Sequence, residues 1–279
     1  MRIPAIFDPD NRLRQLAMAR KSLGRLLRGD CESFPIFVLG MQRSGTTMLM
    51  RVFHRHKDTL VFDEHSDSEA FHDHCLRPAD KIRNILEESR FPFVCFKPIC
   101  DSHKIQSLMR DHPDGHFVWI YRDYADVANS YVRKFANPSR AIRLVCTGQS
   151  GGGWFQDGVS PQMLRVLDDV FRPEMSDLEL ACLIWWARNQ ALLESGLVEA
   201  DNLTLVKYES LVSHPIPVLQ WLFDRIRLPY SQGVTARISP RSIRRHPSPS
   251  LDARVKNLCS TSLRSLDDAY ESRNPPKVI

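Results

Sequence analysis

The stretch FPIFVLGMQRSGTTMLMRVFHRH, residues 34–56, decides the fold of this chain. Residues 36–39 are a short apolar, partly β-branched run and predict a buried strand. Gly40 and Gly45 bracket a turn in which the backbone can approach a ligand closely. From Thr46 onward the apolar residues recur at helical spacing. The loop amides and the first helical amides then point at one place, and the helix dipole favours negative charge there. The stretch therefore predicts an anion site.

The loop differs from a nucleoside-triphosphate loop at one position. Gly40 and Gly45 keep the glycine spacing of G-x-x-x-x-G-K-[ST], and Thr47 keeps its hydroxyl. Thr46 stands where that motif has its lysine, and the only cation in the loop is Arg43. This pattern favours a phosphoanhydride with less charge than ATP. From glycine spacing alone, an ordinary tight strand–helix turn is the alternative.

The run Arg43-Ser44-Gly45-Thr46-Thr47 resembles the 5′-phosphosulfate loop of the PAPS-dependent sulfotransferases, PAPS being 3′-phosphoadenosine-5′-phosphosulfate. The resemblance implies a P-loop-like α/β nucleotide-binding fold and PAPS as the sulfuryl donor. It also implies which loop residues bind that donor: Arg43, Ser44, Gly45, Thr46, Thr47 and Met48.

A second motif follows a strand predicted over residues 116–121. Arg122 and Ser130 resemble the family's 3′-phosphate clamp, an Arg-Asp-x-x-Asp-Val-x-x-Ser pattern. A planar guanidinium can bind a phosphate through two parallel bonds, and a hydroxyl adds one directed bond. Asp126 is expected to favour the start of the following helix through the dipole. For this Arg and Ser taken alone, a helix cap plus a surface charge is the alternative.

Three residues are candidates for the chemistry. A carboxylate after the second strand of an α/β sheet lies near the ligand crevice, and Glu64 resembles the catalytic Glu of the tyrosine-sulfating branch. A solvated acidic loop is the alternative for it. Lys97 ends a strand predicted over residues 93–96 and resembles the family lysine that steadies the sulfuryl group. The His base of the cytosolic branch is replaced by Ile99, which leaves His103 as second choice behind Glu64.

Composition narrows the function classes. The chain has 279 residues, 43% of them hydrophobic and 25% charged, with a net charge of +5. This charge suits an anionic ligand and is too diffuse to indicate nucleic acid. The seven cysteines form no C-x-x-C pair, so neither zinc nor a disulfide framework is indicated. His65, His72 and His74 are metal-ligand types, but their spacing fits no familiar site.

The elements alternate along the chain, which predicts one α/β domain: a three-layer parallel sheet with helices on both faces. We expect a single domain over 1–279, with a helical extension (1–33, amphipathic over 11–27), a core (34–230) and a basic C-terminal segment (231–279). Two interpretations of that segment are open: a basic loop that contacts the 3′-phosphate, as in members of the family, or a disordered or solvated tail. Glycine-rich residues 136–161 predict a flap over the acceptor pocket or an ordinary surface loop.

Further helices are expected at 79–89, 102–110 and 218–227, and another begins at a capping box formed by Ser176 and Glu179. Further strands are expected at 60–62 and 203–207. Tyr208-Glu209-Ser210-Leu211 resembles the family's Tyr-Glu-Asp-Leu segment, with Ser210 in place of Asp, and is interpreted as structural. The N-terminus shows no apolar run long enough for a signal peptide or transmembrane anchor, so a cytoplasmic enzyme is expected.

The resulting hypothesis is sulfuryl transfer from PAPS to a hydroxyl or amine, an EC 2.8.2 activity. Glu64, or else His103, takes the acceptor proton. Arg43, Lys97 and the loop amides stabilise the developing charge, so no metal is demanded. A small molecule, a carbohydrate or a peptide remains open as the acceptor, and so does the oligomeric state. The alternatives are a P-loop small-molecule kinase and a catalytically inactive nucleotide-binding protein.

Overall fold

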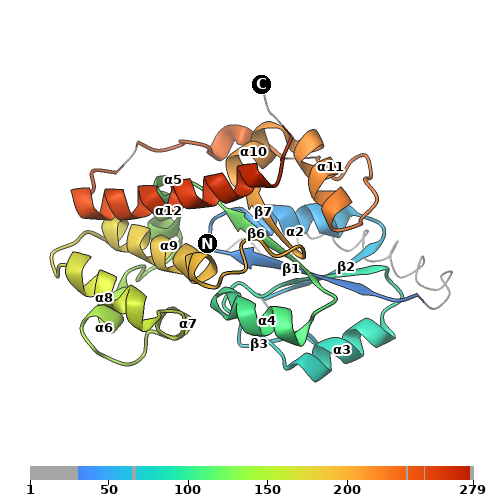
Figure 1. Ribbon diagram of the computed structural model, residues 1–279, viewed down its shortest axis with the longest axis horizontal. Coiled ribbons are helices and arrows are strands. Elements are labelled where there is room, and N and C mark those ends of the chain that lie inside the picture. The colour runs from blue at the N-terminus through green and yellow to red at the C-terminus, as the bar shows by residue number, and fades with distance from the viewer. Residues whose placement is uncertain (1–30, 65–66, 237, 248, 277–279) are drawn as a thin grey trace, which may run out of the picture.

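The computed structural model describes residues 31–64, 67–236, 238–247 and 249–276. Its centre is a sheet of five parallel strands in the order β2-β5-β1-β6-β7 (Figure 1). The strands are β1 (Phe34–Gly40), β2 (Thr59–Asp63), β5 (Phe93–Lys97), β6 (His116–Tyr121) and β7 (Leu203–Lys207). A separate two-stranded antiparallel ribbon joins β3 (Phe71–His72) to β4 (Cys75–Leu76).

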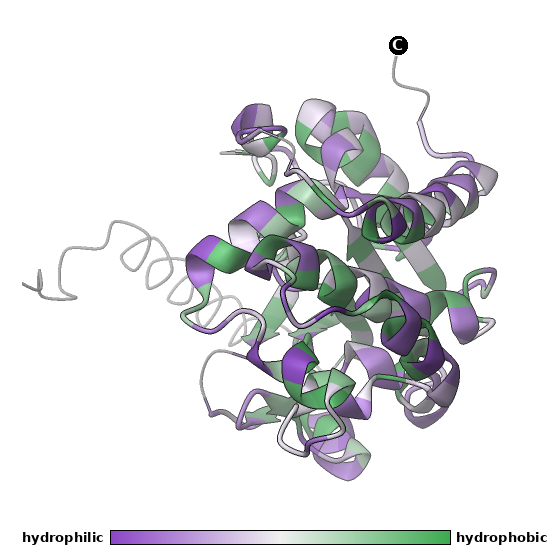
Figure 2. Cartoon of the chain, turned by 90° about the vertical axis from the view of Figure 1, so that its left-hand side faces the viewer, coloured by the Kyte–Doolittle hydropathy of each residue, from purple (hydrophilic) through white to green (hydrophobic). Residues whose placement is uncertain are grey.

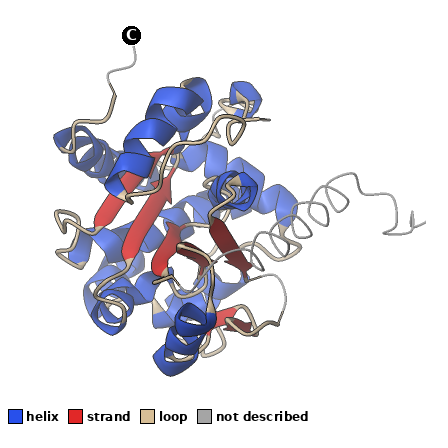
Figure 3. Ribbon diagram, turned by 90° about the vertical axis from the view of Figure 1, so that its right-hand side faces the viewer, coloured by secondary structure: helices blue, strands red, loops and turns tan. Residues whose placement is uncertain are grey.

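Alternation of side chains along β1 divides the core into two layers. Phe37 and Leu39 enter one hydrophobic cluster, while Ile36 and Val38 enter the other. Helices cover both faces of the sheet, and Figure 3 shows the strands between them. In Figure 2 the hydrophobic residues, in green, gather towards the sheet. This arrangement confirms the predicted three-layer α/β fold with a parallel sheet.

The second layer is covered by α2 (Thr46–Arg55), α10 (Tyr208–Ser213) and α11 (Pro215–Arg225). The first layer holds the other helices: α3 (Ala79–Glu88), α4 (Ile105–Asp111), α5 (Tyr124–Lys134), α6 (Arg140–Cys146), α7 (Trp154–Asp157), α8 (Pro161–Val170), α9 (Asp177–Glu194) and α12 (Ala253–Ser272). Two short 3₁₀ turns, η2 (Ser102–Lys104) and η3 (Pro240–Ser242), lie in the connections.

Local sequence patterns predicted the positions of most helices and strands. β6 and β7 have the bounds predicted for them, and the capping box closes at Ser176 and Glu179. The helix expected at 102–110 instead begins as the 3₁₀ turn η2 before α4. Residues 136–161 are not one long loop, because α6 and α7 form within them and bury Ile142 and Phe155. The helix expected over 11–27 lies outside the described residues.

The helix α12 was not predicted and belongs to the main core. Val255, Cys259 and Leu266 are buried in the first-layer cluster, and the helix packs along α9 (Figure 1). The Tyr121 hydroxyl donates to Asp267 at 2.8 Å, which anchors α12 to the end of β6. None of the helices in the described ranges is both long and apolar enough to cross a membrane.

The packing of α12 can be tested by truncating one side chain. We expect Leu266→Ala to lower the free energy of unfolding by about 2–5 kcal/mol, because it removes a fully buried side chain from the main core. Arg264→Ala, at an exposed position of the same helix, is the control and should change it by less than about 0.5 kcal/mol. Denaturant unfolding measures both, and equal midpoints would show that α12 lies outside the cooperative core.

Candidate active site

The loop between β1 and α2 has the geometry of an anion cradle. Gly45 is the N-cap of α2 and has φ +102°, and Arg43 also has a positive φ of 73°. A Cβ at Gly45 would lie 2.3 Å from the ring of Tyr208, so the close packing of this turn requires glycine. Because Gly45 has no side chain with which to cap the helix, the amides of the first turn are available to an anion.

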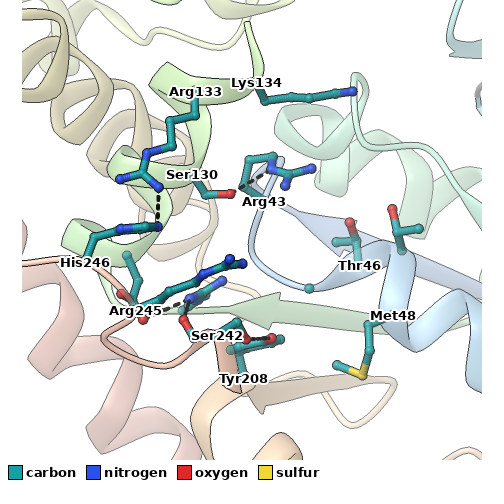
Figure 4. Close-up of a pocket in the computed structure, with 14 residues that line it drawn as sticks. Arg43, Thr46, Met48, Ser130, Arg133, Lys134, Tyr208, Ser242, Arg245 and His246 are labelled. Atoms are coloured by element: carbon teal, nitrogen blue, oxygen red, sulfur yellow. Dashed lines mark hydrogen bonds and ion pairs between the residues drawn. The ribbon is translucent and has the colours of Figure 1, made fainter. Parts of the chain in front are cut away.

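A pocket of about 460 Å³ lies beside this loop (Figure 4). It is lined by the loop and α2, by Arg122 and α5, by the start of α10, and by the segment that follows η3. The lining residues are Arg43, Gly45, Thr46, Thr47, Met48, Arg122, Asp126, Ser130, Arg133, Lys134, Tyr208, Ser242, Arg245 and His246. Five of them are Arg or Lys and a single one, Asp126, is a carboxylate, so the pocket suits a polyanion.

The two sequence motifs meet in this pocket. Arg43 Nε donates to Ser130 Oγ at 2.9 Å although 87 residues separate them. Arg43 also lies near Arg122, and its pKa is lowered by burial and then by the charge of Arg122. Two cations held within reach of each other are stabilised by an anion between them.

Arg122 is the most firmly held side chain of the pocket. Its Nη2 donates to Asp126 Oδ2 at 2.9 Å and to the carbonyl of Ser242 at 2.5 Å. Its guanidinium also lies 4.5 Å from the centre of the Tyr208 ring. The sequence predicts for Asp126 only that it favours the start of the helix through the helix dipole. Its carboxylate instead pairs with Arg122 and accepts from the backbone N–H of Arg244, which fixes the basic C-terminal segment against the pocket.

The start of α5 is fixed by two further carboxylates. Asp123 is the N-cap, and its side chain accepts from the backbone N–H groups of Ala125 and Asp126. Glu209 accepts in turn from the backbone N–H of Asp123 at 3.0 Å. Burial raises the pKa of Glu209. The Tyr-Glu-Ser-Leu segment therefore positions the start of α5, directly after Arg122.

A second group of predicted residues gathers around Lys97. Its side chain is 1% exposed, and Nζ lies 3.0 Å from Asp63 Oδ1 and 3.0 Å from Glu64 Oε2. Nζ also donates to Thr47 Oγ1 at 3.3 Å. Asp63 and Lys97 are register partners of β2 and β5, so the sheet itself places the carboxylates beside the lysine. Lys97 thereby joins Glu64 to the anion loop.

His103 stands apart from this group and does not line the pocket. Its Nδ1 accepts from Arg188 Nη1 at 3.2 Å. Burial, and then the charge of Arg188, lowers its pKa to about 4. The ring is therefore neutral at physiological pH with its proton on Nε2, and its one lone pair is already used by Arg188. This geometry favours Glu64 over His103 as the base.

The sequence patterns did not identify some residues that line the pocket, and Ser44, which they assigned to donor binding, does not line it. Arg133 and Lys134 enter the pocket one turn after Ser130, a spacing that the helix period could have revealed, and Arg133 contacts His246. Tyr208 and Ser242 carry no local signal, and their hydroxyls bond each other. Ser44 is fully buried and outside the pocket lining.

The histidines considered as metal ligands have other partners. His72 lies 3.4 Å from Asp67, and His74 Nδ1 contacts the carbonyl of Glu64 at 2.8 Å. His65 lies outside the described residues. No group of three or more His, Cys, Asp or Glu side chains suited to a metal ion occurs in the part of the chain that the structure describes.

Comparison with known proteins bears on the first motif. The model of the sulfotransferase family matches residues 35–90, which include the anion loop, β2 and Glu64. The resemblance predicted from Arg43 to Thr47 is thereby confirmed, and the match supports sulfuryl transfer as the general activity. Arg122 and Ser130 lie beyond the matched residues. No curated protein matches the sequence.

Similar solved structures are also sulfotransferases. A sulfotransferase domain from the curacin biosynthetic pathway is 16% identical, with a TM-score of 0.49 over 84% of this chain and 98% of the other. The corresponding domain of the Synechococcus PCC 7002 olefin synthase has the same identity and TM-score over 84% of this chain and 96% of the other. A mouse sulfotransferase complexed with PAP is 12% identical, with a TM-score of 0.44 over 94% of this chain and 92% of the other.

The close packing at Gly45 generates a prediction. If the loop binds a PAPS-type donor, as the sequence predicts, the product adenosine 3′,5′-bisphosphate should raise the melting temperature. We expect Gly45→Ala to abolish that rise, because the new Cβ would overlap the Tyr208 ring and displace the loop. Gly196→Ala is the matched control: its φ of +71° gives a similar backbone strain of about 1–2 kcal/mol, but its Cβ would meet no atom within 4 Å. A full ligand-induced shift in the Gly45→Ala protein would contradict this account of the loop.

Proposed function

We propose that this protein transfers a sulfuryl group from PAPS to a hydroxyl or amine acceptor and releases adenosine 3′,5′-bisphosphate. The observation that carries the proposal is the meeting of Arg43, Ser130 and Arg122 in one cationic pocket beside the anion loop. A nucleotide with phosphates at both its 3′ and 5′ positions would satisfy the loop and the clamp together.

The two ends of the pocket are assigned to different phosphates. The amides of the loop and of the first turn of α2 would hold the 5′-phosphosulfate. Arg122 and Ser130 would hold the 3′-phosphate, and Arg245 and His246 lie on the same pocket wall. Arg122 is suited to this role because Asp126 and the Ser242 carbonyl hold its Nη2, which fixes the orientation of the planar guanidinium. The nucleotide would then be positioned for in-line transfer.

Glu64 is proposed as the general base. In the transfer, the acceptor oxygen or nitrogen forms a bond to sulfur while the bond between sulfur and the 5′-phosphate oxygen breaks. The acceptor proton passes to a carboxylate oxygen of Glu64. Glu64 is 7% exposed and is connected to the loop through Lys97 and Thr47, so a base in this position lies next to the transferring group.

Lys97 and Arg43 are proposed to stabilise the charge that develops during transfer. Lys97 contacts Thr47, the last residue of the loop motif, so its ammonium group is next to the proposed sulfuryl position. Arg43 projects from the same loop and would neutralise the leaving 5′-phosphate. The sulfuryl group carries less charge than a phosphoryl group, and these side chains supply the stabilisation without requiring a metal. The acceptor is proposed to be a small molecule, a carbohydrate or a peptide.

The role of Glu64 gives the first test. Glu64→Gln should slow turnover by roughly a hundredfold or more, because the amide cannot accept the acceptor proton. Binding of adenosine 3′,5′-bisphosphate should be unchanged. Asp63→Asn is the matched control, since Asp63 contacts the same ammonium group from a more exposed position, and it should reduce turnover far less. Unchanged turnover in Glu64→Gln would remove Glu64 from the mechanism.

The identity of the nucleotide gives the second test. Adenosine 3′,5′-bisphosphate at a hundred times its dissociation constant should stabilise the protein by about 2.7 kcal/mol, measured as a rise in melting temperature. Arg122→Ala should abolish this rise, whereas Arg110→Ala, at a solvated position on α4, should retain it. A rise with Mg-ATP alone would instead indicate a small-molecule kinase, and binding of the bisphosphate without transfer to any acceptor would indicate an inactive nucleotide-binding protein.

A further inference from the structure

Arg188 is a buried cation that the proposed transfer does not use. It lies on α9 and is 3% exposed. Its guanidinium carbon is 4.1 Å from the centre of the Trp154 ring, which comes from α7 in the glycine-rich segment. Its Nη1 donates to His103 Nδ1 at 3.2 Å. These two contacts fix the plane and the orientation of the guanidinium.

One edge of this guanidinium has donors that no other described residue accepts. Nε and Nη2 are both buried, and neither has a hydrogen-bond partner within the described chain. In a guanidinium, Nε–H and one Nη2–H point the same way along one edge, which is the fork that a carboxylate accepts through two parallel bonds. The contact with His103 uses the other nitrogen, Nη1, and leaves this fork intact. His103 Nε2, also buried and without a partner among the described residues, adds a third N–H donor.

The charge of Arg188 is not neutralised by a carboxylate in the described structure. The nearest acidic group that influences it, Asp101, is already bonded to Lys104 Nζ at 2.8 Å and to the backbone N–H of Leu76 at 2.8 Å. Burial lowers the pKa of Arg188 to about 10, so the side chain is cationic at neutral pH. A buried charge of this kind destabilises a protein unless an opposite charge or several hydrogen bonds compensate it.

Arg188 contacts the segment that follows β5, the strand that ends at Lys97. Cys100 follows β5 by three residues, and burial raises the pKa of its thiol to about 11 while both Arg188 and Glu64 act on it electrostatically. Arg188 and the proposed base therefore both lie within electrostatic range of one side chain. Neither Arg188 nor His103 lines the nucleotide pocket. The fork is thus separate from the residues that line the cationic pocket, and it lies beside His103, six residues after Lys97 in the chain.

We propose that Arg188 selects the acceptor: it binds a carboxylate of a hydroxy acid through Nε and Nη2, with His103 Nε2–H as an additional donor, while the hydroxyl of the same molecule faces Glu64. This inference rests on the proposed sulfuryl transfer and specifies its acceptor class. Arg188 is a specificity-determining residue, and Trp154 makes the glycine-rich segment part of the acceptor pocket. A purely structural role for Arg188, holding α7 through Trp154 and η2 through His103, would not require the fork.

The test compares matched acids and neutral analogues on enzyme saturated with adenosine 3′,5′-bisphosphate. The pairs are 4-hydroxybenzoate and its methyl ester, 3-hydroxybutyrate and its methyl ester, and glucuronate and glucose. Calorimetry measures each dissociation constant. In the wild type, the pair that binds most tightly should favour the acid at least tenfold, since a desolvated charged bidentate pair adds more than about 1.4 kcal/mol, which is tenfold in affinity.

Three variants identify the cause of any preference. Arg188→Met should reduce the preference for the acid to less than twofold and leave the affinity of the neutral analogue nearly unchanged. Arg188→Lys keeps the charge but not the fork and should give an intermediate ratio. Arg143→Met is the matched control, because Arg143 lies in the same layer and donates to the carbonyls of Pro173 and Met175. It should behave as the wild type.

The outcomes separate the two proposals. The inference is overturned if no acid binds, if the best pair shows equal affinities in the wild type, or if Arg188→Met keeps the preference. The melting shift with adenosine 3′,5′-bisphosphate is recorded for every variant and confirms folding of Arg188→Met and Arg188→Lys. If that shift is missing in the wild type while the acid is still favoured through Arg188, the nucleotide proposal fails and the anion-binding role of Arg188 stands.

Discussion

The buried ammonium group of Lys97 constrains the edge of the sheet at which the anion loop lies. A charge that is 1% exposed must be paired, and its partners come from two segments. Thr47 belongs to the anion loop, and Asp63 and Glu64 lie at and directly after the end of β2. These segments can reach one lysine because β2 and β1 lie on either side of β5 in a parallel sheet. The strand order therefore determines which carboxylates stand beside the anion loop.

Positive charge is concentrated along this edge, and each cation is held in a different way. Arg122 is fixed by Asp126 and by a backbone carbonyl, whereas Arg43 is fixed by the neutral hydroxyl of Ser130. A carboxylate partner orients a guanidinium, and the pair has no net charge. A hydroxyl orients the guanidinium and leaves the positive charge unbalanced. Asp126, the one carboxylate that lines the pocket, therefore lies at the Arg122 end, whereas Asp63 and Glu64 stand beside the loop through Lys97.

The supporting residues come from distant parts of the chain. Glu209 at the start of α10 holds the backbone of Asp123, Asp123 caps α5, and α5 carries Ser130 into the pocket. The basic C-terminal segment is held by Asp126 and then leads into α12, whose Asp267 bonds Tyr121 at the end of β6. The C-terminal segment and α12 therefore connect the wall of the cationic pocket to the end of β6 through packed elements.

Local chemistry made much of this predictable. The strand–loop–helix unit at residues 34–56, the bounds of β6 and β7, and the capping box at Ser176 depend on glycine spacing, hydrophobic periodicity and short-range hydrogen bonds. The motif at Arg43–Thr47 predicted a resemblance to the sulfotransferase family, and the model of that family matches residues 35–90. The assignments of individual site residues stay predictions, but the structure does bring Arg43, Arg122 and Ser130 into one pocket.

The sequence by itself determined the fold class, the anion loop and the order of the two motifs, because each depends on neighbouring residues or on a fixed spacing. Only the tertiary structure decided what surrounds them. Thr46 occupies the usual lysine position of the loop, yet Lys97 supplies an ammonium group to that loop from another strand. Likewise, Arg188 binds the one lone pair of His103 across 85 residues, and α12 closes a core layer. These contacts join residues far apart in the chain, and sheet order and packing, which no local pattern encodes, bring them together.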